Sequence, residues 1–349
     1  MLDRTLVEFL IVGVSSLILT AILSHFIIPI LVSKKAGQPI RLEGPKSHYS
    51  KEGTPTMGGI AFIFAILIIA LVAVVVYAIR SEQNRFIPLG LTLALAVFNG
   101  MIGFYDDYKK LTKRKNEGLK AWQKFVLQIV AAVAYVFLLV TFGGIDTTLH
   151  IPFIDKTVPL GIVYYLFAVI LIVGVVNSVN LTDGLDGLAS SITLIVAIFL
   201  AIVLFTVNTP ALENDGTRAS LSFVSAALIG ATIGFLIFNH YPAKVFMGDT
   251  GSLFLGGMLV GAAFMIDEPL IIVIAGGVFV FETLSVILQV SVFQITKKIT
   301  GKEEGYRIFK CSPIHHHFQE SGWSEVVVVT VFTLVTIILC GIAWIGIYF

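Results

Sequence analysis

Residues 59–79 read GIAFIFAILIIALVAVVVYAI, an unbroken run without a charged side chain. A helix of about 20 apolar residues is long enough to cross the hydrocarbon core of a bilayer, so this stretch is typical of one membrane span. Further runs of the same kind predict an all-α, polytopic integral membrane protein with about ten transmembrane helices. The predicted spans are 6–32, 59–79, 87–105, 122–142, 159–177, 188–208, 220–239, 251–266, 270–296 and 325–348.

The composition of the whole chain supports this class. Of 349 residues, 57% are hydrophobic and 13% are charged, against about 45–50% and about 25% in soluble domains. No soluble domain fits into the loops, so residues 1–349 are expected to form a single integral membrane domain. The ninth run, 270–296, is longer than a span requires and ends in polar residues, which indicates a helix that breaks or protrudes into the cytoplasm.

Basic residues divide unevenly between alternate loops. Segments 34–58, 106–124, 240–250 and 297–324 hold 18 Lys and Arg residues together, whereas the opposite side holds five. Cytoplasmic loops retain positive charge, so the first set is expected in the cytoplasm and both termini outside. The same orientation places the loop at 178–187 in the cytoplasm.

Acidic residues stand at the ends of two predicted spans. Asp106 and Asp107 follow the third span, where the helix dipole disfavours anions and the two carboxylates repel each other. A divalent cation or the following lysines would offset this charge, and a solvated helix end is the alternative. Asp249 stands just before the eighth span between Gly248 and Gly251, where it either caps the helix or binds a phosphate or metal-phosphate ligand.

A polar stripe precedes the sixth span. Asn177, Asn180, Asp183 and Asp186 recur every three residues, so they line one face wherever the segment is helical. Polar groups at membrane depth are unfavourable without partners. Four polar side chains on one stripe therefore favour a bound polar ligand over a simple helix cap.

The last cytoplasmic loop contains three successive histidines, His315, His316 and His317. Adjacent residues of a regular helix or strand do not all converge on one metal ion, which argues against zinc. Hydrogen bonding to a phosphate or a sugar is the functional interpretation, and a solvated loop is the alternative. The loops on the opposite side are expected to be plain connectors.

Together these motifs resemble the phospho-N-acetylmuramoyl-pentapeptide-transferases, also called translocase I of peptidoglycan synthesis. The resemblance covers nearly the whole chain. It rests on residues 51–59 (KEGTPTMGG), Asp106-Asp107 with Lys110, residues 177–189, residues 248–252, and His315-His316-His317-Phe318 followed by Gly322-Trp323.

The resemblance implies a reaction and a location. Phospho-N-acetylmuramoyl-pentapeptide would pass from UDP-N-acetylmuramoyl-pentapeptide to undecaprenyl phosphate, giving lipid I and releasing UMP. Mg²⁺ is the implied cofactor, because it lowers the repulsion between two anionic substrates. The implied protein is a homodimer in the bacterial cytoplasmic membrane, with its active site facing the cytoplasm, and no nucleic-acid partner is expected.

The resemblance also implies roles for individual residues. Asp249 resembles a metal ligand, with Asp106 and Asp107 as metal-site or proton-accepting carboxylates, and Asp106 is the residue expected to help deprotonate the lipid phosphate. Phe246 resembles a uracil platform, although from the residues alone it is equally a lipid-facing aromatic. The other implied substrate contacts are Lys51, Thr56, Lys110, Lys124, Asn177, Asn180, Asp183, Asp186, Asn239, Gln289, His315, His316 and His317.

Two other functions fit parts of the sequence. A related polyprenyl-phosphate transferase that uses UDP-N-acetylglucosamine would need the same carboxylates, and only the first loop and the histidine region favour the muramoyl substrate. A transporter also has many spans, but transporters place a polar site near the midplane, often in paired broken helices, and neither feature is present. Direct transfer and a covalent enzyme intermediate both stay open, since a carboxylate serves as base or as nucleophile.

Overall fold

The computed structural model describes residues 2–34, 51, 53–80, 87–113, 118–154 and 156–348. Ten helices of this part of the chain are long and apolar enough to cross a membrane, which confirms the all-α polytopic class and the predicted count. Most of the basic loop predicted over 34–58 lies outside the described residues.

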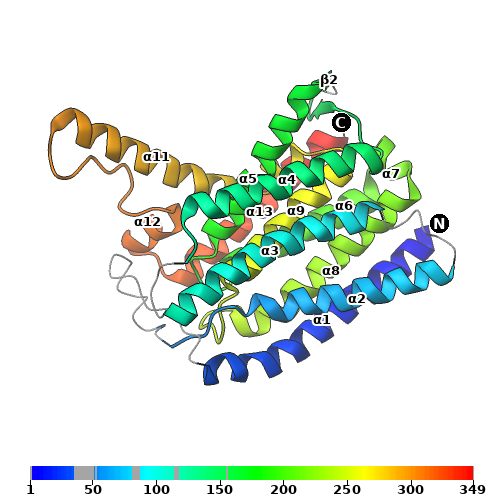
Figure 1. Cartoon of the computed structure of the whole chain (residues 1–349), viewed down its shortest axis with the longest axis horizontal. Coiled ribbons are helices and arrows are strands. Elements are labelled where there is room, and N and C mark those ends of the chain that lie inside the picture. The colour runs from blue at the N-terminus through cyan, green and yellow to red at the C-terminus, as the bar shows by residue number, and fades with distance from the viewer. Residues whose placement is uncertain are drawn as a thin grey trace.

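The ten long helices run lengthwise in one bundle (Figure 1). They are α1 (Leu2–Ser33), α2 (Gly59–Ile79), α3 (Ile87–Lys113), α4 (Ala121–Phe142), α5 (Ile162–Thr182), α6 (Leu188–Thr206), α8 (Asp215–Asn239), α9 (Gly248–Met265), α11 (Gly277–Thr300) and α13 (Glu325–Tyr348). The short elements are β1 (Thr148–Ile151), β2 (Lys156–Pro159), α7 (Pro210–Glu213), α10 (Ile271–Ala275) and α12 (Ile314–Glu320).

Helix α9 is the centre of the bundle, because 94% of the residues in its apolar 18-residue stretch are buried. Its glycines allow neighbouring backbones to approach closely. A Cβ atom added to Gly256 would lie 2.7 Å from the Cα of Val176 in α5, and one added to Gly257 would lie 2.7 Å from the Cα of Ala96 in α3. The helices that position the polar clusters are therefore packed backbone to backbone, which fixes their relative height.

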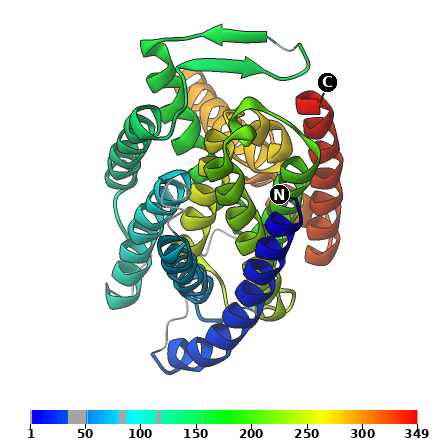
Figure 2. The ribbon, with the colours of Figure 1, turned by 90° about the vertical axis from the view of Figure 1, so that its right-hand side faces the viewer.

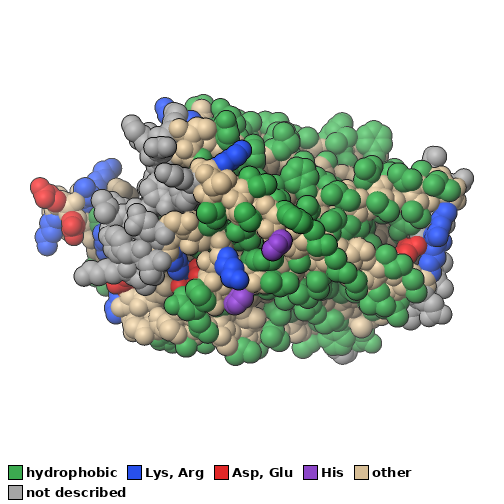
Figure 3. Space-filling view, turned by 90° about the horizontal axis from the view of Figure 1, so that it is seen from below, with side chains coloured by type: hydrophobic (Ala, Val, Ile, Leu, Met, Phe, Trp, Pro, Cys, Tyr) green, Lys and Arg blue, Asp and Glu red, His purple; other side chains and the backbone are tan. Residues whose placement is uncertain are grey.

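The outer surface is apolar along its middle and charged toward its ends (Figure 3). Helix α1 illustrates this, because only 11% of the residues in its most apolar 18-residue stretch are buried. Ile11 and Val14 of this helix are more than half exposed. Exposed aliphatic side chains on this scale fit contact with lipid rather than with water.

Both chain termini lie at one end of the bundle (Figure 1), as an even number of spans requires. The ninth predicted run is broken: α10 ends at Ala275, Gly276 separates the two pieces, and α11 begins at Gly277. The far half of α11 projects away from the other helices at the end opposite the termini (Figure 1). The break and the projecting helix confirm this part of the prediction for residues 270–296, and its cytoplasmic side stays a prediction.

The loops on the side of the termini are more than connectors, so that expectation is wrong. Strands β1 and β2 pair as an antiparallel hairpin, seen at the top edge of Figure 2. His150 of β1 lies 2.8 Å from a carboxylate oxygen of Glu268, which follows α9. Burial and the neighbouring carboxylates of Glu268 and Asp146 raise the pKa of Asp267 to about 7.

Candidate active site

Two helix ends bring the predicted aspartates together. Helix α3 continues to Lys113, past the predicted end at 105, so Asp106 and Asp107 lie inside its last turns. Helix α9 begins at Gly248, so Asp249 lies in its first turn rather than ahead of it. That position favours an anion, because the unpaired N–H groups of a helix start carry partial positive charge. Both boundaries differ from the sequence-based ones because tertiary packing extends the helices beyond their apolar runs.

The three aspartates form one cluster, the acidic triad Asp106, Asp107 and Asp249. One carboxylate oxygen from each lies within 4.8 Å of the others. Asp106 and Asp107 are buried and Asp249 is partly exposed. The helices meet closely beside the triad, since a Cβ on Gly103 would lie 2.1 Å from the carbonyl oxygen of Asp249. Glycine at position 103 therefore allows the close approach of α3 to α9.

Two lysines reach into the acidic triad. Lys110 Nζ lies 2.7 Å from Asp106 Oδ2 and 3.1 Å from Asp249 Oδ2. Lys124, from α4, lies 3.0 Å from the same Asp106 oxygen and also pairs with Asp249. Two cations face three carboxylates, which leaves room for further positive charge.

The oxygens of the acidic triad are unequally satisfied. Asp107 Oδ2 accepts hydrogen bonds from the N–H and hydroxyl of Thr250, at 2.9 and 2.7 Å. Asp106 Oδ1 accepts the N–H of Leu119 at 2.6 Å. Asp107 Oδ1 is buried and accepts no hydrogen bond from the described residues, whereas the buried Asp106 Oδ2 is held by its ion pairs with Lys110 and Lys124. Buried carboxylate oxygens of this kind fit a hard divalent cation such as Mg²⁺.

The amides predicted in the polar stripe support the acidic triad from α5. Asn180 donates to Asp249 Oδ1 at 3.0 Å and to the hydroxyl of Ser252 at 2.8 Å. Asn177 donates to Gln128 Oε1 at 2.8 Å and so ties α5 to α4. These contacts fix side-chain orientations around Asp249.

The stripe itself is helical only in its first half. Helix α5 ends at Thr182, so Asp183 and Asp186 lie in the turn before α6, and Gly187 takes a φ of +76° there. Burial and the nearby charges of Asp249 and Asp107 raise the pKa of Asp183 well above its ordinary value, as expected for a carboxylate close to the acidic triad. The prediction of one shared face applied only to a helical segment, so it concerns Asn177 and Asn180 alone, and Asp183 and Asp186 belong to the turn.

Lys51 joins a second group of charges, which sequence reasoning found only in part. Its Nζ lies 2.6 Å from Asp186 Oδ1 and 2.6 Å from Glu325 Oε1. The same ammonium lies 5.9 Å from the ring centroid of the partly exposed Phe246. Glu325 was not predicted, because an acidic residue in the first turn of a span has an ordinary explanation in the helix dipole.

His315 is fully buried at the edge of this group. Its Nδ1 lies 3.0 Å from Glu282 Oε2, and a Cβ on Gly184 would lie 2.2 Å from its Nε2. Burial and the charge of Lys51 lower the pKa of His315 to about 3. The imidazole is therefore neutral near pH 7 and packs against the turn that carries Asp183 and Asp186.

The other two histidines point elsewhere. His316 Nδ1 lies 2.9 Å from Gln319 Oε1, and burial and His315 lower its pKa to about 4. His317 Nδ1 accepts the N–H of Lys310 at 3.1 Å. The three imidazoles therefore have different partners, Glu282, Gln319 and the backbone of Lys310.

Three further predicted contacts have internal partners or close neighbours. Asn239 accepts the hydroxyl of Ser190 and donates to the carbonyl of Val245, both at 2.9 Å. Gln289 pairs with both backbone groups of Phe309, at 3.1 and 2.9 Å. Thr56 is buried beside the acidic triad, since a Cβ on Gly248 would lie 2.8 Å from its hydroxyl and 2.6 Å from Asp107 Oδ2.

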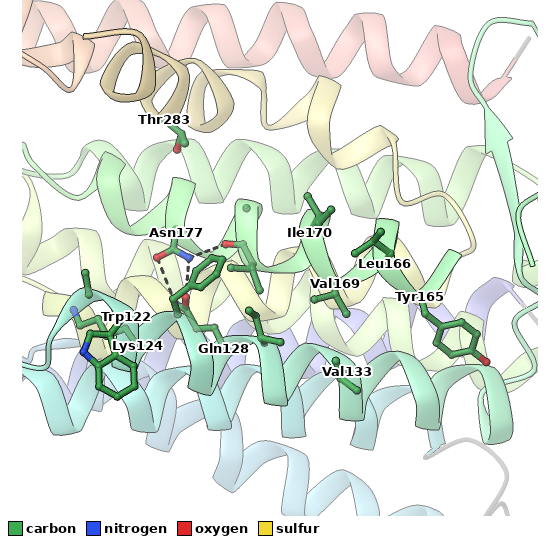
Figure 4. Close-up of a pocket in the computed structure, with 15 residues that line it drawn as sticks. Trp122, Lys124, Gln128, Val133, Tyr165, Leu166, Val169, Ile170, Asn177 and Thr283 are labelled. Atoms are coloured by element: carbon green, nitrogen blue, oxygen red, sulfur yellow. Dashed lines mark hydrogen bonds between the residues drawn. The ribbon is translucent and has the colours of Figure 1, made fainter. Parts of the chain in front are cut away.

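A groove of about 950 Å³ runs along α4 and α5 and ends beside the acidic triad. In Figure 4, Trp122, Lys124 and Asn177 mark one end and Tyr165 the other. Its middle is aliphatic, and Leu166 and Ile170 are more than half exposed. Its lining residues are Ala121, Trp122, Lys124, Phe125, Gln128, Ile129, Val133, Tyr165, Leu166, Val169, Ile170, Val173, Gly174, Asn177 and Thr283.

Known proteins resemble this chain over its full length. Residues 89–267 match the family described as glycosyl transferase family 4, and residues 51–63 match signature 1 of the phospho-N-acetylmuramoyl-pentapeptide-transferases. A protein of that name from Clostridium perfringens (strain 13 / Type A) is 43% identical, over 99% of each chain. Another, from Staphylococcus epidermidis (strain ATCC 35984), is 44% identical, over 96% of this chain and 98% of its own. A third, from Clostridium botulinum (strain Eklund 17B / Type B), is 42% identical, over 99% and 98%.

Proposed function

The chain belongs to the phospho-N-acetylmuramoyl-pentapeptide-transferase family, and we propose that the acidic triad binds the Mg²⁺ ion of its reaction at the cytoplasmic face. The protein transfers phospho-N-acetylmuramoyl-pentapeptide from its UDP carrier to undecaprenyl phosphate in peptidoglycan synthesis. An oxygen of the lipid phosphate bonds to the sugar-linked phosphorus, the bond from that phosphorus to the UMP oxygen breaks, and UMP leaves.

One observation supports the proposed metal site above all others: three carboxylates and two lysines from the three helices α3, α4 and α9 meet at one end of the bundle. When bound there, Mg²⁺ would offset the charge of the diphosphate oxygens. Lys110 and Lys124 add charge and orientation for the phosphates. Asp106 lies between both ammonium groups and is the residue proposed to accept the proton of the lipid phosphate.

The nucleotide is proposed to occupy the side of Lys51 and Phe246. The partly exposed Phe246 ring offers a flat face to uracil, and the Lys51 ammonium, paired with Asp186, lies over that ring 5.9 Å from its centroid. Asn180 and Asp183 lie between this subsite and the acidic triad, where the diphosphate would pass. His315, neutral near pH 7, would hydrogen-bond the sugar or phosphate from the Gly184 turn.

The lipid substrate is proposed to lie in the groove along α4 and α5. The groove is aliphatic along its length and open to the outer surface, as a polyprenyl tail requires. Lys124 lines it and also touches Asp106 and Asp249, so a phosphate at that end would reach the acidic triad. The groove thus supplies a route from the bilayer to the reacting groups.

The orientation and assembly are part of the same proposal. The ends of α3 and α9 that carry the acidic triad lie opposite the two termini (Figure 1), and the sequence assigns most Lys and Arg residues to the loops of that side. The positive-inside rule therefore supports a site facing the cytoplasm in the inner membrane. We also keep the single membrane domain and the homodimer as proposals, the latter supported by the family resemblance.

Purified protein is expected to release UMP from UDP-N-acetylmuramoyl-pentapeptide only with Mg²⁺. Chelation of the metal should lower the rate at least about a hundredfold, and added Mg²⁺ should restore it. Release measured with and without undecaprenyl phosphate separates direct transfer, which needs the lipid, from a covalent route. UDP-N-acetylglucosamine in a parallel assay tests the related substrate. A chain that releases no UMP with Mg²⁺ and both substrates would contradict the function.

Filling the groove is expected to weaken use of the lipid substrate alone. Gly174 lines the groove with open space at its Cβ position, so Gly174→Leu places an isobutyl group there. Because each buried CH₂ contributes about 0.8 kcal/mol, displaced tail contacts should raise KM for undecaprenyl phosphate at least about tenfold. Gly90→Leu, in an equally open position on α3, is the matched control. A lipid KM unchanged by Gly174→Leu would place the tail elsewhere.

A further inference from the structure

Glu325 connects three segments that are far apart in the chain. It is the first residue of α13, and only 8% of it is exposed. Its Oε1 lies 2.6 Å from Lys51 Nζ and accepts the backbone N–H of Asp186 at 2.5 Å. One carboxylate oxygen therefore holds both the ammonium of Lys51 and the turn before α6. The resulting Lys51–Asp186–Glu325 network involves none of the carboxylates of the acidic triad.

The geometry of the network bears on Lys51 more than on Asp186. Asp186 has a second anchor, because its Oδ2 accepts the N–H of Ala243 at 2.9 Å. Lys51 instead has a flexible four-carbon stem, and the structure gives its ammonium two carboxylate partners, Asp186 and Glu325. Those partners hold the ammonium 5.9 Å from the centre of the Phe246 ring. Removing one of the two partners should widen the range of positions that the ammonium takes.

We propose that Glu325 is a positioning residue for nucleotide binding, which fixes the Lys51 ammonium over the Phe246 ring. This inference rests on the proposed nucleotide subsite. Glu325 itself does not contact the base; it sets the place and direction of the ammonium donors that meet the polar edge of a stacked base. A pre-placed donor spares the ordering of a long side chain on binding, so the effect belongs to affinity rather than to chemistry.

The test compares Glu325→Gln with Glu320→Gln, an exposed acid on α12 outside the network. Calorimetry with UMP gives the dissociation constant of each purified variant, and steady-state rates give kcat and the KM of both substrates. Glu325→Gln should raise the UMP Kd and the KM of the UDP substrate about tenfold, because charge-assisted hydrogen bonds are lost. Its kcat and lipid KM should stay within about twofold, as should every constant of Glu320→Gln.

Two further variants separate positioning from folding. Glu325→Asp keeps the negative charge and should recover part of the UMP affinity. This variant still tests the proposal if Glu325→Gln folds poorly. In a Lys51→Met background, Glu325→Gln should change the UMP Kd by less than about twofold, because the two residues act through one contact. A full tenfold loss in that background, or an unchanged Kd in the single variant, would overturn the positioning role. Failure of the wild-type protein to bind UMP would instead overturn the proposed nucleotide subsite.

Discussion

Asp249→Asn is expected to lower kcat about a thousandfold or more, with the shape of the side chain retained. Asp249 contacts Lys110, Lys124 and Asn180 and completes the acidic triad, so the substitution removes one negative charge from the proposed Mg²⁺ site. Loss of one preorganised electrostatic group commonly lowers turnover by about 10²–10³, and loss of a metal ligand adds to this. UMP release at saturating substrates, followed over a Mg²⁺ titration, measures the effect.

A binding measurement keeps that result separate from general loss of activity. Mn²⁺ serves as a paramagnetic probe for the Mg²⁺ site, and its affinity should fall at least about tenfold in Asp249→Asn. Asp215→Asn is the matched control, because Asp215 also stands in the first turn of a span, at the opposite end of the bundle. Its turnover and Mn²⁺ affinity should match the wild type. An Asp249→Asn protein with wild-type Mn²⁺ affinity would remove Asp249 from the metal site.

Asp106→Asn is expected to remove most turnover and to leave nucleotide affinity nearly intact. Asp106 Oδ2 faces Lys110 and Lys124, the latter a lining residue of the groove, and general acid–base catalysis contributes about 10²–10⁴ in rate. The UMP Kd, measured by calorimetry, should stay within about threefold. Unchanged turnover would refute the role.

The pH dependence of the same variant tests proton transfer itself. The second pKa of a phosphate monoester is about 6, so the lipid phosphate is already largely a dianion at pH 8.5. The defect of Asp106→Asn, as a ratio of rates, should therefore be largest near pH 6 and shrink as the pH rises. A defect of equal size across this range would instead assign Asp106 to the binding of metal or phosphate.

The span count could be predicted from the sequence because it depends on one local quantity. A stretch such as 59–79 is too apolar and too long to be exposed to water, so it is expected to cross the membrane. Helix α2 covers the same residues. The boundaries near the site were harder to predict. Asp106 and Asn180 lie in helices that continue past their apolar runs, because side-chain contacts with Lys110 and Asp249 stabilise the polar turns. Such contacts cannot be predicted from the apolar content of the sequence alone.

The residue types at the site were predicted better than their contacts. The sequence singled out the aspartates and the lysines that meet in the acidic triad. It also placed Gln289 and Asn239 among the substrate contacts, and in the structure both have internal partners. Glu325 and Glu282 were not among the predicted contacts. Each lies in or at the start of an apolar span, where a lone acid has several ordinary explanations, and only the packed neighbours distinguish them.

The sequence alone was sufficient to predict about ten membrane spans, the clustering of polar residues at one end of them, and the carboxylates proposed for the site. These properties follow from apolar length, from the alternation of spans and from residue type, all of which are local. Only the tertiary structure decided which oxygens face each other, how Lys51 is shared between Asp186 and Glu325, and where a groove opens. Those arrangements depend on the relative heights of α3, α5 and α9, and these heights are fixed by backbone contacts at Gly103, Gly256 and Gly257 between residues far apart in the chain.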